Sequence, residues 1–255
     1  METPGTIETM ESRLNNLRQN ASKDGFSLFA RTSKADFIDS DVDLKTNAVT
    51  IPLHLDDDSV YTGFDEKKQE YQNQFGEAMD SHKAAIFAAQ KMTMEYFGVS
   101  GNHRLREDIY SHDDWNRDFV SVTDFKNKNA AVCLERSALA HNLLKFGGED
   151  SVLLAGDCNL VGKVEAHSFN VVKKDDGYYI FDPTNPSLGE VNEQGHLDAY
   201  LPATYEISNE QFDRLMKGEP IEVVHLEIKK ENEGYKKIPS GQKRIYKLNI
   251  IKGNI

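Results

Sequence analysis

Two different hydrophobic periods divide the centre of the chain into a helical part and a strand part. After Cys133, apolar residues recur every three or four positions until Gly147-Gly148, which is typical of an amphipathic helix that ends at glycine. Residues 166–173 alternate with a period of two, and apolar residues resume at 178–182 after a polar turn at 174–177. The sequence therefore predicts a helix followed by an antiparallel hairpin.

Segments outside this centre repeat the same two patterns. Residues 81–97 carry an apolar stripe between a capping residue, Ser81, and a stop at Gly98, and they predict the clearest helix outside the centre. We expect the strands to form one antiparallel sheet with the hairpin and the helices to pack on it, which is an α+β fold. Further helices are predicted at 104–110 and 208–217, and further strands at 151–156, 221–229 and 243–251.

The N-terminal part of the chain has a weaker pattern. Residues 6–20 predict a short amphipathic helix, either a docking arm or part of the core. Residues 21–80 are polar, acidic and poorly periodic, apart from a strand-like run at 48–55 that a proline interrupts. This region is interpreted as an irregular cover over the core or a lid near the site. We therefore divide the chain into an N-terminal extension, residues 1–80, and a folded domain, residues 81–255.

Three residues at the ends of the predicted central elements suggest nucleophilic chemistry. Cys133 opens the helix, where partially positive backbone N–H groups favour a thiolate and can hold a developing oxyanion. His167 opens one strand of the hairpin, and Asp182 closes the other. If 174–177 form the loop, residues whose numbers add up to 351 face each other, which places Asp182 one diagonal step from His167. The three side chains are candidates for nucleophile, base and orienting carboxylate.

The order and spacing of these residues resemble the transglutaminase-like superfamily, a group of papain-related cysteine enzymes. His167 follows Cys133 by 34 residues, Asp182 follows His167 by 15, and Pro-Thr comes next, as in the family. Residues 143–156 also resemble the family's helix end, glycine and following strand. One departure is Ala130-Ala131, which stands where the family often has glycine.

The resemblance covers roughly residues 100–185 and implies a catalytic domain with a transglutaminase-like, papain-like core. It implies that Cys133 attacks an amide carbonyl of a protein or peptide substrate and forms an acyl-thioester. It implies no metal ion and no organic cofactor. The backbone N–H of Cys133 is the best candidate for an oxyanion donor, and side-chain donors from Trp115, Asn127 or Asn129 are alternatives.

The acceptor of the acyl group distinguishes the possible enzymes. Water gives a cysteine protease, an amidase or a glutamine deamidase, whereas a lysine amine gives a transglutaminase. We expect hydrolysis rather than cross-linking, because no calcium-binding pattern accompanies the core. A second hypothesis is a catalytically silent module that acts in protein–protein interaction, since a lone cysteine, histidine or aspartate is more often structural. A third is a partner-binding or host-directed factor whose acidic N-terminal region recognises one target protein.

Charge and cysteine content restrict the partners and the compartment. The net charge of −12 disfavours nucleic acid as a partner. The basic pairs at 229–230, 236–237 and 243–244 are interpreted as a solvated strand edge. Two cysteines indicate free thiols in a reducing compartment, and Cys158 is expected in a loop without a catalytic role. The sequence shows neither a membrane-spanning run nor a signal peptide, so we expect a cytoplasmic protein without a membrane partner.

Two metal-binding patterns were considered, and both fail. Residues 39–43 have the D-x-D-x-D rhythm of a calcium loop, but Leu44 and Thr50 stand where an EF-hand requires glycine and glutamate. A zinc site lacks any C-x-x-C or H-x-x-x-H pair. The side chains considered for zinc were Cys133, Cys158, His141 and His167.

Overall fold

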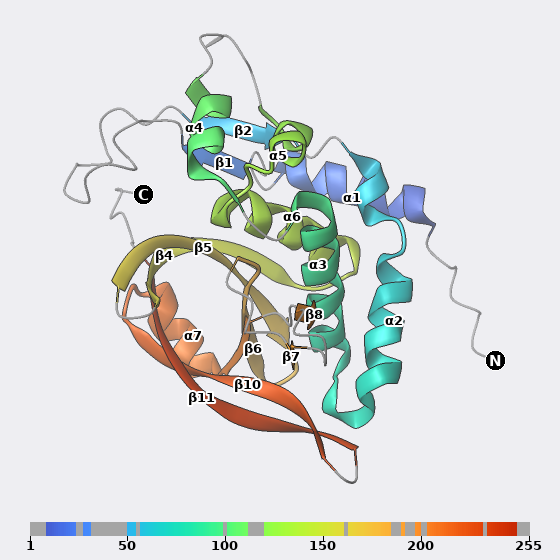
Figure 1. The fold of residues 1–255 in the computed structure, drawn as a ribbon, viewed down its shortest axis with the longest axis vertical. Helices are drawn as coiled ribbons and strands as arrows, with labels where there is room; N and C mark the ends of the chain where they lie inside the picture. The colour runs from blue at the N-terminus through green and yellow to red at the C-terminus, as the bar shows by residue number, and fades with distance from the viewer. Residues whose placement is uncertain are drawn as a thin grey trace.

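The computed structural model describes residues 9–23, 28–31, 50–54, 57–98, 101–111, 120–160, 163–184, 190–191, 197–199, 203–231 and 234–248. These residues form a group of helices that lies against a closed, six-stranded antiparallel sheet (Figure 1). The mixture of helices and antiparallel strands confirms the predicted α+β class. The strands of this sheet close on themselves, a feature that the sequence pattern did not predict.

The helical part is arranged around α6, which contacts α1, α3, β4 and β5. A small sheet lies beside it, with β1 and β2 antiparallel and β2 and β3 parallel. The helices are α1 (Met10–Lys23), α2 (Phe64–Phe75), α3 (Ser81–Phe97), α4 (His103–Ser111), α5 (Val122–Lys128) and α6 (Cys133–Phe146), with 3-10 turns η2 (Asp58–Tyr61) and η3 (Gly76–Ala78). The small sheet consists of β1 (Leu28–Arg31), β2 (Thr50–His54) and β3 (Val120–Ser121).

The closed sheet has the strand order β10-β11-β4-β5-β6-β9, and pairing of β9 with β10 completes the ring. Helix α7 lies across this ring in the view of Figure 1 and contacts β6, β10 and β11. The strands are β4 (Ser151–Leu160), β5 (Lys163–Lys174), β6 (Gly177–Asp182), β9 (Ala203–Ile207), β10 (Ile221–Glu231) and β11 (Gly234–Leu248), while β7 (Glu190–Val191) and β8 (Leu197–Ala199) form a separate pair. Helix α7 spans Asn209–Met216.

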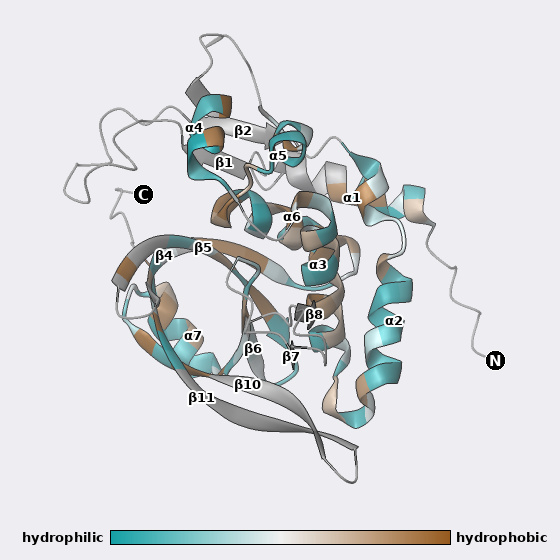
Figure 2. Cartoon of the chain, viewed as in Figure 1, coloured by the Kyte–Doolittle hydropathy of each residue, from teal (hydrophilic) through white to brown (hydrophobic). Residues whose placement is uncertain are grey.

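Alternation along the β5–β6 hairpin divides its side chains between two hydrophobic cores. Phe169 and Ile180 belong to the core inside the closed sheet. Val172 and Phe181 belong to the core shared with the helices. Hydrophobic residues accordingly follow β5 and the helices above it in Figure 2. Both faces of the hairpin are therefore buried, which fixes its register against slippage.

The predicted hairpin register is confirmed. Asn170 faces Phe181 and Val171 faces Ile180, as expected for residue numbers that add up to 351. The turn is tighter than predicted, because Lys174 and Gly177 still pair and leave two residues in the loop. The predicted bounds of α6 and α3 are also confirmed.

Two predictions about these elements were wrong, and two helices were missed. Strand β4 continues beyond residue 156 to Leu160, so Cys158 lies within a strand and not in a loop. Asp80, not Ser81, caps α3, because its carboxylate accepts the N–H of Lys83 at 2.7 Å. Helices α2 and α5 were not predicted at all.

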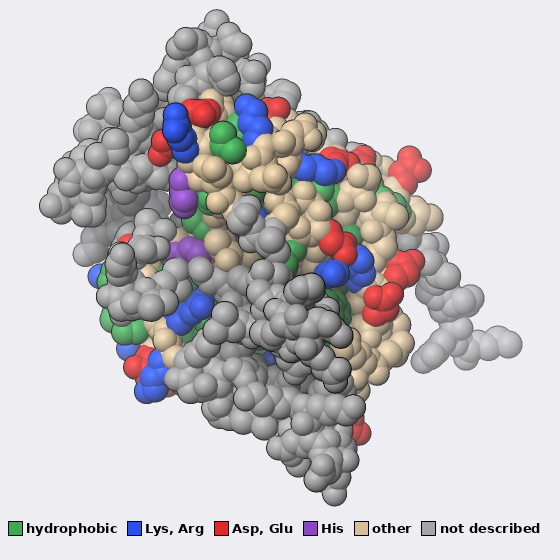
Figure 3. Space-filling view, in the orientation of Figure 1, with side chains coloured by type: hydrophobic (Ala, Val, Ile, Leu, Met, Phe, Trp, Pro, Cys, Tyr) green, Lys and Arg blue, Asp and Glu red, His purple; other side chains and the backbone are tan. Residues whose placement is uncertain are grey.

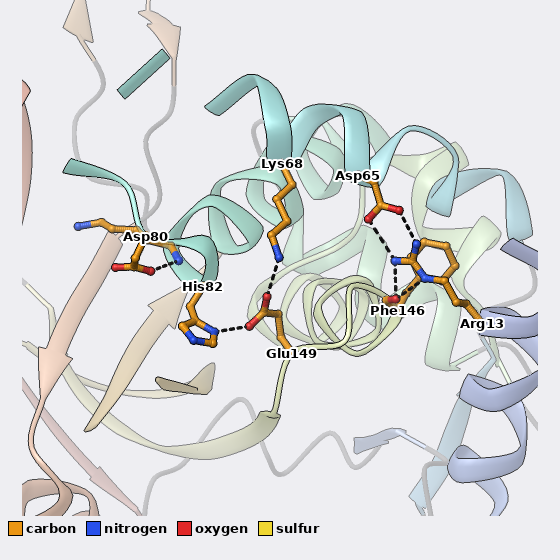
Figure 4. A network of polar contacts seen from close by, with 8 residues as sticks. Arg13, Asp65, Lys68, Asp80, His82, Phe146 and Glu149 are labelled. Carbon is orange, nitrogen blue, oxygen red and sulfur yellow. Dashed lines mark hydrogen bonds and ion pairs between the residues drawn. The ribbon is translucent and has the colours of Figure 1, made fainter. Parts of the chain in front are cut away.

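Polar contacts join the N-terminal helices to the end of α6 (Figure 4). Arg13 of α1 donates hydrogen bonds to the carbonyl oxygen of Phe146 at 2.8 and 2.6 Å. Glu149, which is buried just after α6, accepts a hydrogen bond from Lys68 of α2 at 3.0 Å and lies 2.6 Å from Nδ1 of His82 of α3. The helix predicted near the N-terminus therefore packs on the helical core. In the part of the chain described here, no helix has the length and apolar character needed to cross a membrane.

Candidate active site

Cys133 is the first residue of α6 and is partly exposed. The residue before it, Val132, occupies the N-cap position and has no side-chain acceptor for the first-turn N–H groups. Glu135 reaches back instead and accepts the N–H of Val132 at 3.0 Å, and its other oxygen accepts a hydrogen bond from Arg106 at 2.8 Å. Helical geometry gives the N–H of Cys133 no partner within α6. This end of the helix is thus fixed by Glu135.

The segment that leads into α6 is tightly packed. Ala130 and Ala131 are fully buried. A Cβ atom at Gly101 would lie only 2.0 Å from the carbonyl oxygen of Ala131. Arg136 donates hydrogen bonds to Ala131 at 3.1 Å and to the carbonyl oxygen of Gly98 at 2.9 Å. The close backbone contact before Cys133 is thus provided by Gly101 on a neighbouring segment, while alanine stands at the position where the resemblance suggested glycine.

His167 and Asp182 form a buried hydrogen bond between Nε2 and Oδ2 of 2.8 Å. Because Nε2 is occupied by Asp182, Nδ1 is the ring nitrogen left for Cys133. Burial lowers the pKa of His167, but the charge of Asp182, their hydrogen bond and the neighbouring Cys133 outweigh burial and raise that pKa to about 10. The structure therefore brings the three predicted residues together, with His167 as an imidazolium at neutral pH. On the face shown in Figure 3, histidine side chains reach the surface where the helices meet the closed sheet.

Asp182 has further partners that the sequence interpretation missed. Its Oδ1 accepts the backbone N–H of Thr184 at 3.0 Å. Its Oδ2 lies 3.3 Å from Nη1 of Arg244 and 3.5 Å from the hydroxyl oxygen of Tyr246. Arg244 was interpreted as part of a solvated strand edge, and this was wrong, because its side chain is only 16% exposed. The available signal was the alternation along β11, which places Arg244 on the same face as Tyr246 and Leu248.

A row of hydrogen bonds, here called the interface row, crosses the helix–sheet interface. It joins α6 to β5, and α3 to the residue that follows β6. Ser137, one turn after Cys133, donates to the carbonyl oxygen of Ser168 at 2.8 Å. Asn170 donates to the carbonyl oxygen of Ser137 at 3.1 Å. Gln90 of α3 donates to the carbonyl oxygen of Pro183 at 3.2 Å. Because Ser168 follows His167 and Pro183 follows Asp182, two of the three bonds fix the residue next to a site residue. Sequence reasoning did not identify this interface row.

The remaining candidates lie elsewhere or outside the described residues. Cys158 is buried in the core inside the closed sheet. His141 is buried in α6 with its Nδ1 2.9 Å from the hydroxyl oxygen of Ser151. Asn127 and Asn129 are exposed at the end of α5. Within the described ranges, no group of three or more histidine, cysteine or carboxylate residues is arranged to hold a metal ion. The proposed donor Trp115 and the acidic residues 39–43 lie outside the described ranges.

Comparisons with known proteins add no family to this picture. No protein-family model matches the chain, and no curated protein matches it significantly. Function must therefore be inferred from the chemistry of the site itself.

Proposed function

We propose that this protein is a cysteine-dependent enzyme of the transglutaminase-like type, which hydrolyses or transfers the acyl group of a protein or peptide amide. The observation that carries the proposal is the buried 2.8 Å hydrogen bond between His167 and Asp182, placed beside Cys133 at the start of α6. A partly exposed nucleophile, a base next to it and a buried orienting carboxylate are the parts that acyl transfer requires.

The first half of the reaction uses the charge state of the site. An imidazolium at His167 stabilises a thiolate at Cys133, and the thiolate attacks the carbonyl carbon of the amide. The carbon–sulfur bond forms while the carbonyl π electrons move to oxygen, where the N–H of Cys133 is the candidate donor to the oxyanion. As the oxyanion collapses, the carbon–nitrogen bond breaks and His167 gives its proton to the leaving amine. The products of this half are a free amine and an acyl-thioester.

The second half returns the enzyme to its starting state. Neutral His167 takes a proton from the acceptor, whose oxygen or nitrogen attacks the thioester carbon. The carbon–sulfur bond then breaks, its electrons return to the sulfur of Cys133, and the imidazolium–thiolate pair is restored. Water as acceptor gives a carboxylic acid, and an amine gives a new amide. We favour water, because the sequence shows no calcium-binding loop of the EF-hand type.

The rate of alkylation of Cys133 by iodoacetamide, measured against pH by mass spectrometry, tests the proposal. We expect Cys133 to be alkylated readily at pH 6–7, because a cationic partner favours the thiolate. Replacing His167 by alanine should move the profile to higher pH. Cys158, which is fully buried, serves as an internal control and should react slowly in both proteins.

A second variant separates the effect of the base from a general loss of packing. His141→Ala also removes a buried histidine, which lies in α6 itself and contacts the hydroxyl of Ser151 at 2.9 Å. We expect this variant to keep the low-pH alkylation of Cys133. If native Cys133 instead follows an ordinary thiol profile that His167→Ala leaves unchanged, the acyl-transfer proposal is wrong and a silent interaction module takes its place. If the proposal survives, screening glutaminyl and peptidyl amides with and without a primary amine identifies the acceptor.

A further inference from the structure

The carboxylate of Asp182 is fully buried and lies between two cationic side chains. Its Oδ2 atom is 2.8 Å from Nε2 of His167 on one side and 3.3 Å from Nη1 of Arg244 on the other. The hydroxyl of Tyr246 lies 3.5 Å from Oδ2, and the backbone N–H of Thr184 donates to Oδ1 at 3.0 Å. Asp182 is therefore shared between His167 and a second charged partner from a distant strand.

The two cations differ in what happens to them during the proposed reaction. His167 loses its proton to the leaving amine, after which a neutral imidazole faces Asp182. A buried carboxylate without a counter-charge is strongly disfavoured, so an isolated His167–Asp182 pair would resist this proton loss. A guanidinium keeps its proton throughout the accessible pH range. Arg244 therefore remains the charged partner of Asp182 in the state in which His167 is neutral.

We propose that Arg244 is a positioning residue of the site, which acts as the permanent counter-ion of Asp182 and thereby makes the proton of His167 easier to release. The inference rests on the proposed function and adds a fourth side chain to its machinery. Arg244 acts through Asp182 and does not need to contact the substrate. The juxtaposition depends on β11 pairing with β4, because the two residues are 62 positions apart in the chain.

The other titratable groups around Asp182 do not supply this charge. Among the described residues they are Cys133 on α6, Cys158 on β4, Tyr205 on β9 and Tyr246 on β11. Burial is the largest effect on both tyrosines and raises the pKa of each above its ordinary value of 10, so both stay neutral while His167 titrates. The guanidinium carbon of Arg244 lies 5.6 Å from the ring centroid of Tyr205, which adds a cation–π contact that holds Arg244 in place.

The proposal is tested by following the imidazole of His167 directly. Nuclear magnetic resonance of nitrogen-15-labelled histidine reports the titration of each ring, and His167→Gln identifies the signal of interest. In Arg244→Met, we expect the midpoint of the His167 titration to move upward by on the order of one pH unit, because a like charge near the imidazolium has been removed. Arg244→Lys restores the charge and should return the midpoint toward that of the native protein.

Lys243→Met is the matched control for the loss of one positive charge. Lys243 is the preceding residue of β11, its side chain is 64% exposed, and it pairs with Glu222 at 2.7 Å on the outer face. We expect this variant to leave the midpoint unchanged. An unchanged or lowered midpoint in Arg244→Met would overturn the proposal, as would an equal rise in Lys243→Met or a failure of Arg244→Lys to restore the native value.

The test distinguishes a folding defect from loss of the counter-ion, and the counter-ion role from the acyl-transfer function. If circular dichroism shows that Arg244→Met does not fold, Arg244→Gln takes its place, because it removes the same charge and keeps a hydrogen-bond donor. The midpoint of the His167 titration is then measured in Arg244→Gln. The midpoint requires no substrate and no turnover. If Cys133 proves unreactive while the midpoint still rises in Arg244→Met, the acyl-transfer function fails, and Arg244 keeps only the counter-ion role. If Cys133 is reactive and the midpoint does not move, the counter-ion role fails and the function stands.

Discussion

Two buried histidines show how the partner of an imidazole decides its charge. His167 faces the carboxylate of Asp182, and this contact, with that of Cys133, outweighs burial and raises its pKa to about 10. His141 faces the neutral hydroxyl of Ser151, so burial dominates and, with the charge of Lys145, lowers its pKa to about 3. At neutral pH the first ring is therefore cationic and the second is neutral. The charge state of each ring therefore depends on its partner as well as on burial.

These opposite charge states predict opposite effects of pH on stability. Between pH 6.5 and about 10, native His167 holds a proton that the unfolded chain has released, so the free energy of unfolding should fall as pH rises. Between about 3 and 6.5, the unfolded chain binds a proton that native His141 does not, so the free energy of unfolding should fall as pH decreases. Urea unfolding of the native protein across both windows measures the two slopes.

Single variants assign each slope to its residue. His167→Gln should flatten the alkaline slope and leave the acidic one, while His141→Gln should do the reverse. If the alkaline slope is the same in His167→Gln as in the native protein, the stabilising contact between His167 and Asp182 is not formed in solution. The two variants serve as controls for each other, because each removes one buried imidazole.

At the scale of elements, local periodicity predicted the parts of the site but not their surroundings. The 3.6-residue period after Cys133 and the alternation through His167 and Asp182 are local properties, so α6 and the β5–β6 register followed from them. Helix α2 was missed because its buried side chains, Phe64 and Phe75, lie at its two ends and its interior shows little period. Pairing between distant strands has no local signature, which is why the contact of Arg244 with Asp182 was not foreseen.

From the interface row, we expect Ser137 to contribute more to the geometry of the site than to the free energy of unfolding. Ser137→Ala removes the bond to Ser168 and should lower the free energy of unfolding by about 1 kcal/mol, the typical value for one hydrogen bond. Because α6 then loses one tether to β5, we also expect Cys133 to be alkylated more slowly at pH 6–7, where the imidazolium–thiolate pair must be held together. Alkylation and urea unfolding measured on the same sample separate the two effects.

A second side chain of α6 provides the control for this change. Asn142 is buried and donates to the carbonyl oxygen of Ala138 at 3.0 Å, within its own helix. Asn142→Ala should destabilise the protein by a similar amount without altering the alkylation profile. Equal slowing of alkylation in both variants would show that loss of stability, and not the tether to β5, controls the reactivity of Cys133.

At the scale of the whole molecule, closure of the sheet brings strand β11 to the candidate site. Strand β11 pairs with β4, and β4 pairs with β5, so residues of β11 are brought close to His167. Gly156 lies at this junction, opposite His167 on β5 and opposite Leu248 on β11. A Cβ atom at Gly156 would lie 2.2 Å from the carbonyl oxygen of Lys247 and 2.8 Å from the Cα atom of Leu248. The neighbours are backbone atoms, so the conflict is relieved only if a strand moves.

Gly156→Ala is therefore expected to act on the site from a distance. Displacement of β11 should cost about 1–3 kcal/mol of stability, the range for an overpacked position, and should draw Arg244 away from Asp182. The His167 titration midpoint should then rise, as in Arg244→Met. Gly148→Ala is the control, because Gly148 has a left-handed backbone (φ +80°) but no atom within 4 Å of a new Cβ, so it strains the chain without moving β11. A stability loss in Gly156→Ala with an unmoved midpoint would mean that the closed sheet supports the fold but does not set the charge balance of the site.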